Sequence, residues 1–276
     1  MIGQLIITLR EALEALLLVS IMVAYLKKTE REQYVKSTIY GAVIAFFTGG
    51  LIAVGVINIY GALEESSEAL FEGLASLLAV GVLTYMIYWM AIKGRDLRLD
   101  VERKIAASGG SLAIASASYI FVVREVIETI LFLIPFATRD LLGTIIGVVL
   151  GISIAFIFSY GIVVGVIRFS LRRFFFYSSI LLVLIAGGLV GYGIHEILEY
   201  VAELGRDLGW LATSAYHLNI PETSLFHHEG LIGSIFAVFF GYSVEMEWLR
   251  LLAHLGYLGI TLPLIMNLYS TNSQNS

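Results

Sequence analysis

Cysteine is absent from this chain of 276 residues. Its absence excludes thiolate metal ligands, disulfide bonds and catalysis by a cysteine nucleophile. Charged residues are also scarce: they make up 14% of the chain, whereas soluble domains hold about 25%. Hydrophobic residues account for 58%. This composition predicts an all-α integral membrane protein, with the lipid bilayer as its first partner.

Seven apolar segments are long enough to cross a bilayer, which takes about 20 residues in a helix. We predict spans at 2–26, 37–60, 70–92, 112–136, 142–167, 177–200 and 248–268. No basic segment precedes the first span, so we expect a helix of the mature protein and not a signal peptide. The apolar stretch 231–242 is too short to span, and we expect a re-entrant or interfacial helix within an outer loop at 201–247. One transmembrane domain would then cover 1–268, followed by a disordered polar tail at 269–276.

Basic residues gather in alternate loops, after the first, third and fifth spans. These loops hold twelve of the 17 lysines and arginines: Lys27, Lys28, Arg31, Lys36, Lys93, Arg95, Arg98, Arg103, Lys104, Arg168, Arg172 and Arg173. Positively charged loops face the cytoplasm, which predicts an outer N-terminus and a cytoplasmic C-terminus. The opposite loops are acidic and would concentrate cations at an outer mouth.

The pattern Arg-Glu-x-x-Glu occurs twice, at Arg10–Glu14 in the first span and Arg124–Glu128 in the fourth. A charge at the centre of a membrane helix costs about 2.5–3.5 kcal/mol on insertion scales, so six charges in two spans need a compensating role. The two glutamates of each motif share a helix face. We therefore predict an oxygen-rich site for a hard cation. Its predicted metal ligands are Glu11, Glu14, Glu125 and Glu128, with Arg10 and Arg124 as counter-charges.

Each motif would alternatively be an intrahelical ion pair with a purely structural role. Two acids and one base, however, leave one carboxylate per helix uncompensated. A structural pair would not need that extra charge, so the excess favours ligands over a neutral pair.

The two motifs are also spaced as an internal repeat would place them. Spans one to three, at 2–92, match spans four to six, at 112–200, in length. Because each half has three spans, the halves run in opposite directions through the membrane. We therefore predict a 3+3 inverted repeat plus one last span, an architecture of secondary transporters whose sites lie at the repeat interface.

On these motifs the chain resembles the iron permease family, which comprises the fungal oxidase-dependent ferric permeases and their prokaryotic relatives (the iron/lead transporter family). The resemblance extends over residues 1–268 and includes Phe71-Glu72-Gly73, Gly187-Gly188-Leu189 and His195-Glu196. It implies uptake of Fe(III), with the four motif glutamates as iron ligands. It also implies an extracytoplasmic ferroxidase or iron-delivery protein as a candidate partner.

Other polar residues near the outer ends of the spans are candidates for supporting roles. The candidate pathway residues are Glu72, His195, Glu196 and Glu199. The candidates for outer capture are Glu64, Glu65, Glu68, His227, His228 and Glu229. The sequence His-Glu-x-x-Glu in the sixth span lacks the second histidine of a zinc-protease helix, which argues against a protease.

Together these features predict a permease that imports Fe(III) across the cell membrane, with iron as substrate, no permanent cofactor and no nucleic-acid partner. Four glutamates and two arginines sum to −2, so charge alone does not select Fe(III) over Fe(II), although hardness favours Fe(III). The alternatives are a transporter for Mn, Fe(II) or Pb, a proton channel or metal sensor, and a membrane di-iron carboxylate enzyme. The enzyme is disfavoured because such sites contain Glu-x-x-His, which neither motif matches.

Overall fold

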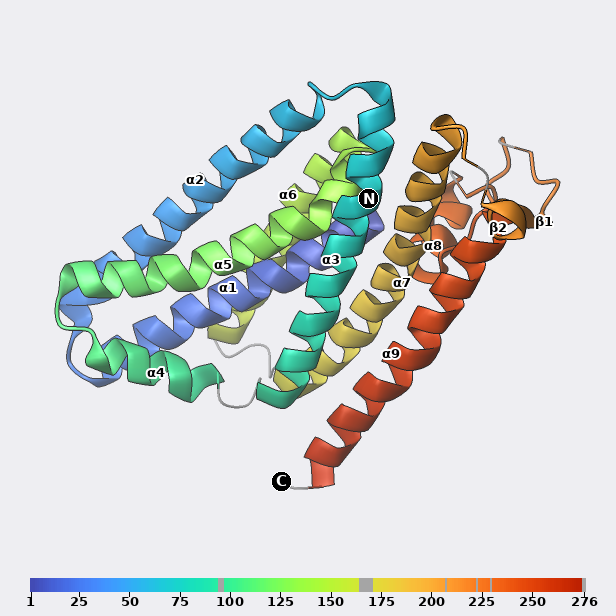
Figure 1. Ribbon diagram of the computed structural model, residues 1–276. Helices are drawn as coiled ribbons and strands as arrows, with labels where there is room; N and C mark the ends of the chain where they lie inside the picture. Colours follow the sequence, from blue (N-terminus) through green and yellow to red (C-terminus); the bar gives the residue numbers. More distant parts are fainter. Residues whose placement is uncertain (94–96, 164–170, 207, 222, 229, 275–276) are drawn as a thin grey trace.

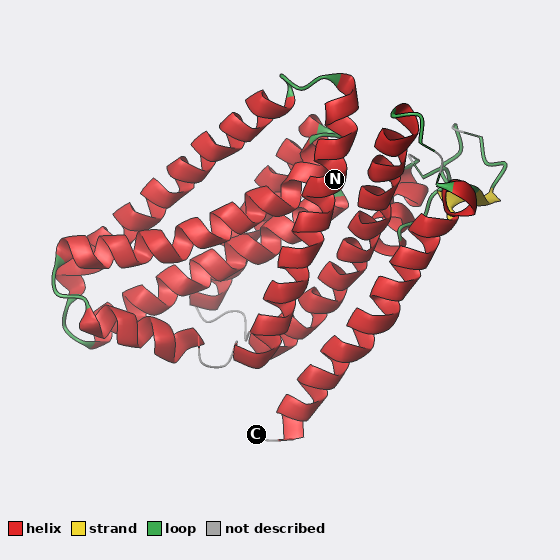
Figure 2. Cartoon of the chain, in the orientation of Figure 1, coloured by secondary structure: helices red, strands yellow, loops and turns green. Residues whose placement is uncertain are grey.

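In the computed structural model the described residues are 1–93, 97–163, 171–206, 208–221, 223–228 and 230–274. They form long helices and one small two-stranded sheet (Figures 1 and 2). The helices are α1 Ile2–Lys28, α2 Val35–Tyr60, α3 Glu65–Lys93, α4 Leu97–Ala107, α5 Ser111–Ala137, α6 Leu141–Val163, α7 Leu171–Glu203, α8 Leu231–Phe240 and α9 Trp248–Gln274. The strands β1 Ser214–His217 and β2 Glu245–Glu247 pair antiparallel. We call this pair of strands the hairpin, although the connection between them contains α8.

A helix occupies each predicted span, although the end of the fifth, 164–167, lies outside the described residues. Within the described part, five helices are long and apolar enough to cross a membrane: α2, α3, α6, α7 and α9. Helices α1 and α5 have 27 residues each but carry the charged motifs inside their apolar runs. The architecture is therefore that of an all-α polytopic membrane protein.

Helix α1 lies at the centre of the bundle and packs against α6 and α5 (Figure 1). Helix α5 in turn packs against α2, and α3 packs against α7. The contact of α1 with α6 and that of α5 with α2 correspond to each other, because each joins the first helix of one half to the second helix of the other half. This exchange of partners is the pattern that a two-fold relation between the halves would produce.

Glycines allow both of these contacts to be close. A Cβ atom on Gly41 of α2 would overlap the carbonyl oxygen of Ala115 in α5. A Cβ atom on Gly151 of α6 would lie 3.0 Å from the carbonyl oxygen of Leu5 in α1. Small residues at such crossings let membrane helices approach and gain van der Waals contact.

Two buried apolar clusters lie on either side of the first motif along α1. The first contains Ile7 and side chains of α3, α5, α7 and α9, including Leu83 and Phe132. The second contains Leu18 and Leu26 and involves α4 and the start of α5. The charged motif of α1 therefore lies between two apolar layers, which exclude water from it.

One end of the bundle holds the start of α1, the loops before α3 and α6, helix α8 and the hairpin, and we call it the hairpin face (Figure 1). Helix α8 matches the short helix expected at 231–242. It ends at Phe240 and is capped by Gly241, whose φ of 61° is left-handed and favours glycine. The predicted outer loop thus contains regular structure that covers the end of α7.

The structure differs from the expectations at two places. Helix α4 falls where only a basic loop was expected, and it packs on α1 through Val101 and Ile105. Helix α9 continues to Gln274, through most of the segment 269–276 expected to be disordered. Tyr269 explains part of this extension, because its buried ring packs against Phe176 and its hydroxyl lies 3.2 Å from that of Ser179.

Candidate metal sites

The first motif forms a buried ionic cluster on α1. Nη1 of Arg10 donates a hydrogen bond of 2.6 Å to Oε1 of Glu11, and its Nη2 lies 2.7 Å from Oε1 of Glu14. All three side chains are at most 4% exposed. The same guanidinium also contacts the sulfur of Met86 in α3 at 3.0 Å. Packing of α1 among its neighbours therefore holds the whole motif out of solvent.

The second motif has the same spacing but a different environment. Nε of Arg124 donates to Oε1 of Glu128 at 2.7 Å. The guanidinium lies over the ring of Trp89, 5.2 Å from its centroid, and is 47% exposed. Glu125 is buried, at 5% exposure. In this half of the site Arg124 is therefore accessible to solvent, whereas Glu125 is not.

Three of the four predicted ligands come together between the helices. Glu11, Glu14 and Glu125 each offer a carboxylate oxygen, and these oxygens lie within 4.8 Å of one another. Glu128 lies outside that group but interacts electrostatically with Glu14 and Glu11. The structure thus places the carboxylates of both motifs at one locus.

Several of these carboxylate oxygens have no hydrogen-bond donor within the described part of the chain. Oε2 of Glu11, Oε2 of Glu125 and Oε2 of Glu128 are buried without a hydrogen bond. Oε1 of Glu14 contacts Arg10 without hydrogen-bond geometry. A buried oxygen left without a partner is costly. A cation bound among Glu11, Glu14 and Glu125, whose carboxylates lie close enough to share one ion, would give these residues a partner.

A second polar group lies near the hairpin face, where α3 crosses α7. Gly73 and Gly193 allow a close approach there, since a Cβ on Gly193 would lie 3.0 Å from the carbonyl oxygen of Gly73. Glu72 accepts a 2.5 Å hydrogen bond from the hydroxyl of Tyr60. Glu72 also interacts electrostatically with Glu196. The predicted pathway residues of α3 and α7 are therefore neighbours.

His195, Glu196 and Glu199 form a compact group on α7, with one ligand atom of each within 4.8 Å of the others. Nδ1 of His195 lies 2.7 Å from Oε1 of Glu247 in β2. Burial alone would raise the pKa of Glu247, but the hydrogen bond with His195 and other contacts bring that pKa below its ordinary value. This pair ties the hairpin to the end of α7.

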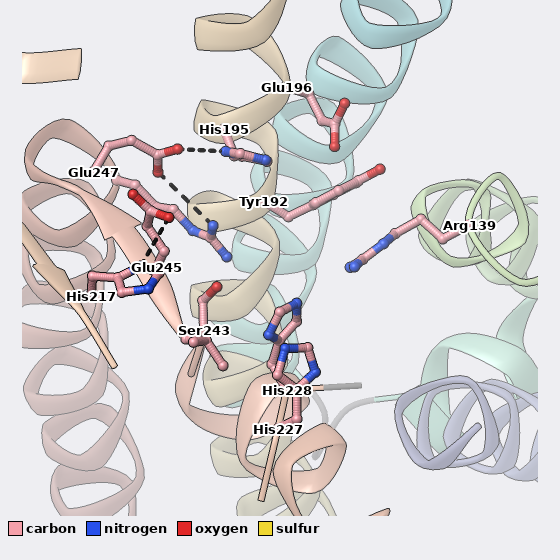
Figure 3. Close-up of a pocket in the computed structure, with 12 residues that line it drawn as sticks. Arg139, Tyr192, His195, Glu196, His217, His227, His228, Ser243, Glu245 and Glu247 are labelled. Atoms are coloured by element: carbon pink, nitrogen blue, oxygen red, sulfur yellow. Dashed lines mark hydrogen bonds and ion pairs between the residues drawn. The ribbon is translucent and has the colours of Figure 1, made fainter. Parts of the chain in front are cut away.

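A cavity of about 530 Å³ adjoins this pair (Figure 3). His227 and His228 line it, with ring centroids 4.2 Å apart. Of the other residues expected to capture ions, Glu64 is exposed and Glu68 half-buried at the start of α3. Glu229 and the side chain of Glu65 lie outside what the structure describes. The expected capture residues therefore divide between the α3 end and the cavity.

Sequence reasoning missed further residues of this cavity. They are Arg139, Tyr192, His217, Glu245, Glu247 and Arg250. Nδ1 of His217 lies 3.1 Å from Oε2 of Glu245 across the hairpin. The alternation of polar and apolar residues in Glu245-Met246-Glu247 is typical of a strand and could have indicated one. Its partner strand, however, lies about thirty positions earlier in the chain.

Comparison with known proteins identifies the family of this chain. The model of the Iron permease FTR1 family matches residues 1–267. The chain belongs to this family. The family and the apolar helices together make it a multi-pass membrane permease of iron transport.

Relatives support the same assignment. An uncharacterised protein of Archaeoglobus fulgidus is 50% identical over 269 residues, which cover 98% of this chain and 96% of that protein. The protein named ferrous iron permease EfeU of Yersinia pestis is 30% identical over 200 residues, 70% of this chain and 71% of its own length. EfeU of an Escherichia coli strain is 28% identical over a similar share. No solved structure matches the chain.

Proposed function

We propose that this permease imports iron across the cell membrane and that Glu11, Glu14, Glu125 and Glu128 bind the ion in transit. The observation that carries the proposal is the cluster of carboxylate oxygens from α1 and α5, several of them buried without a hydrogen bond. An anionic cage of oxygen atoms replaces the hydration shell of a hard cation. Iron is here the substrate and not a resident cofactor.

The depth of the motifs fits a site in the middle of the membrane. Glu14 lies twelve residues before Leu26, the last apolar residue of α1, which is about 18 Å along a helix. Glu125 lies twelve residues before Ala137, or about 18 Å. The hydrocarbon layer is about 30 Å thick, so we propose that α1 and α5 also span it and bring both motifs near its midplane.

The exchanged helix contacts support an inverted repeat. The basic residues in and around α4 favour a cytoplasmic position for this helix. We therefore propose that α4 is cytoplasmic and that the N-terminus and the hairpin face are outside. In such transporters one repeat moves against the other around a central site. The apolar clusters on both sides of the first motif suit an occluded state of this cycle. We propose that movement of the repeats exposes the glutamates to each side in turn. The ion or proton gradient would supply the energy, because the sequence has no nucleotide-binding motif.

Two oxidation states of iron fit the site on different grounds. Fe(III), the ion implied by the resemblance to fungal permeases, gains most from hard anionic oxygens. Fe(II) would neutralise the net charge of −2 that the two motifs carry, and neutrality is favourable at low dielectric. The relatives named ferrous iron permease add support for Fe(II). A carrier for Mn or Pb is compatible with the same carboxylates.

Uptake of radioactive iron into proteoliposomes tests the proposal. Fe(III)-citrate, Fe(II) held reduced with ascorbate, and Mn(II) would be measured in parallel. Glu14→Gln and Glu125→Gln each keep the size of the side chain but remove an anionic ligand, so we expect uptake to fall to the background of empty liposomes. Glu32→Gln, an exposed residue outside the motifs, is the matched control. Wild-type uptake by both motif variants would show that these glutamates are not the transport site.

A further inference from the structure

Three potential ligands at the hairpin-face end of α7 are not explained by the buried glutamate site. His195, Glu196 and Glu199 bring an imidazole nitrogen and two carboxylate oxygens within 4.8 Å of one another. His195 and Glu199 are four residues apart and share a helix face. A nitrogen and two anionic oxygens at such distances can bind one metal ion without rearrangement of the backbone.

The hairpin fixes His195 in the manner of a metal ligand. Glu247 in β2 lies 2.7 Å from Nδ1 of the ring, so Nε2 is the nitrogen directed to a ligand. Arg250 lies 3.9 Å from the other oxygen of Glu247 and helps to hold that carboxylate. Histidines that bind metals usually donate their second ring N–H to a carboxylate, which sets the tautomer and the orientation of the ring. The contact with Glu247 therefore presets the ring orientation that a metal ligand at this position needs.

The surroundings are partly exposed and contain more acidic than basic groups. Figure 3 shows His227 and His228 across the cavity from His195. Five carboxylates lie in or beside this region: Glu72, Glu196, Glu199, Glu245 and Glu247. The basic groups are Arg139, which lies over the ring of Tyr192, and Arg250. The excess of negative charge attracts a cation, and the cavity admits it with part of its water.

We propose that His195, Glu196 and Glu199 form a second metal site, which binds a divalent first-row ion at the hairpin face before the ion reaches the buried glutamates. The donor set selects the class of ion. Imidazole suits Fe(II), Zn(II), Ni(II) and Cu(II), whereas Mg(II) and Ca(II) prefer oxygen donors alone. In an iron permease the expected ion is Fe(II). The order of the two sites along the path of the ion rests on the proposed function, but metal binding at the second site does not.

Binding of Co(II) to the purified full-length chain in detergent tests the site. Co(II) is stable in air and takes the same donors as Fe(II). The double variant Glu14→Gln, Glu125→Gln removes the buried site, and we expect it to retain one tight Co(II) site in equilibrium dialysis. Adding His195→Gln or Glu199→Gln, which removes a direct ligand, should weaken that site more than about a hundredfold. Adding Glu203→Gln, an exposed residue on the next turn of α7, should leave it unchanged.

Two further measurements separate ligation from a structural effect. The X-ray absorption spectrum of the bound Co(II) should show scattering from an imidazole, and that signal should disappear in the His195→Gln variant. Glu247→Gln alters only the residue that positions His195, so its loss of affinity should be intermediate, about 10-fold to 100-fold. Each variant must elute as a single species in size-exclusion chromatography. If His195→Gln fails this control, Glu199→Gln provides the test instead.

Tight binding that survives both His195→Gln and Glu199→Gln would overturn the proposal, as would a bound ion with oxygen neighbours only. These outcomes are independent of the uptake assay. If His195→Gln abolishes Co(II) binding while the motif variants still transport iron, the second site is supported and the proposed transport site is refuted. Loss of uptake in the motif variants with Co(II) binding unaffected by His195→Gln would do the reverse.

Discussion

Arg10 and Arg124 occupy the same position in the two motifs, yet the side chain of Arg10 is 1% exposed and that of Arg124 is 47% exposed. The difference follows from the place of their helices. Helix α1 is surrounded by other helices, whereas Arg124 lies over Trp89 at the border of the bundle. Two identical motifs therefore place their counter-charges in different dielectric environments.

This asymmetry predicts unequal effects on stability. Arg10→Ala would leave Glu11 and Glu14 buried without a counter-charge, which costs about 3–5 kcal/mol for a buried pair. Arg124→Ala breaks a pair whose arginine is 47% exposed and whose glutamate is 14% exposed. Solvent at the arginine lowers the cost of this break towards that of a surface pair, about 0–1 kcal/mol. The apparent melting temperature in detergent should therefore fall much further for Arg10→Ala. Arg98→Ala, which breaks an exposed pair on α4, gives the baseline. Equal shifts for Arg10→Ala and Arg124→Ala would contradict the buried cluster.

Two glycines of α2 predict opposite responses to the same substitution. Gly41→Ala places a methyl group against the backbone of α5, where neither partner can move cheaply. We expect lower melting temperature and weaker iron uptake, because α2 supports the helix that carries Glu125. Gly50→Ala meets nothing within 4 Å and should be neutral or stabilising by up to about 1 kcal/mol. A destabilising Gly50→Ala would show that α2 has another neighbour at that face.

The long helices and the motif cluster could be predicted because both depend on local periodicity. An apolar run of about 20 residues already implies a membrane helix, and the spacing of Glu11 and Glu14 places them on one face. That α1 and α5 lie together followed from the repeat of one motif. The extra carboxylate in each motif indicated a ligand, and this role stays a prediction; the structure shows that Oε2 of Glu11 is buried without a hydrogen bond.

Helix α4 and the hairpin could not be predicted in the same way. Four of the eleven residues of α4 are lysine, arginine or glutamate, so its sequence resembles a solvated loop. They are Arg98, Glu102, Arg103 and Lys104. It is held by tertiary contacts, among them hydrogen bonds from Arg31 to the carbonyl oxygens of Ile105 and Ser108. The strands have three and four residues, and they pair only because α7, α8 and α9 bring them together. The cavity depends on those same long-range contacts.

Glu68 predicts a kinetic effect that depends on salt. Glu68 carries one negative charge, which at about 10 Å through water lowers the energy of a divalent cation by about 0.8 kcal/mol. This raises the local concentration of the cation roughly fourfold. Glu68→Gln should therefore raise the KM for iron at low ionic strength, with kcat unchanged. At 1 M salt the Debye length is about 3 Å and the difference should disappear. Glu32→Gln removes the same charge at the opposite end of the bundle and should leave KM unaltered. A KM change that persists at high salt would instead indicate direct ligation.

The proposed orientation predicts different accessibility of two alanines. The chain has no cysteine, so a single engineered thiol reports its own position. Ala62 is exposed in the loop before α3, on the hairpin face, and Ala107 is exposed at the end of α4. Ala62→Cys should react with a membrane-impermeant maleimide in intact cells, whereas Ala107→Cys should react only after permeabilisation. Both are alanine-to-cysteine changes at exposed positions, so a difference in labelling reports the side of the membrane and not the burial of the thiol. Labelling of Ala107→Cys in intact cells, with protection of Ala62→Cys, would place α4 outside. The second metal site would then face the cytoplasm, where it would receive ions on their release.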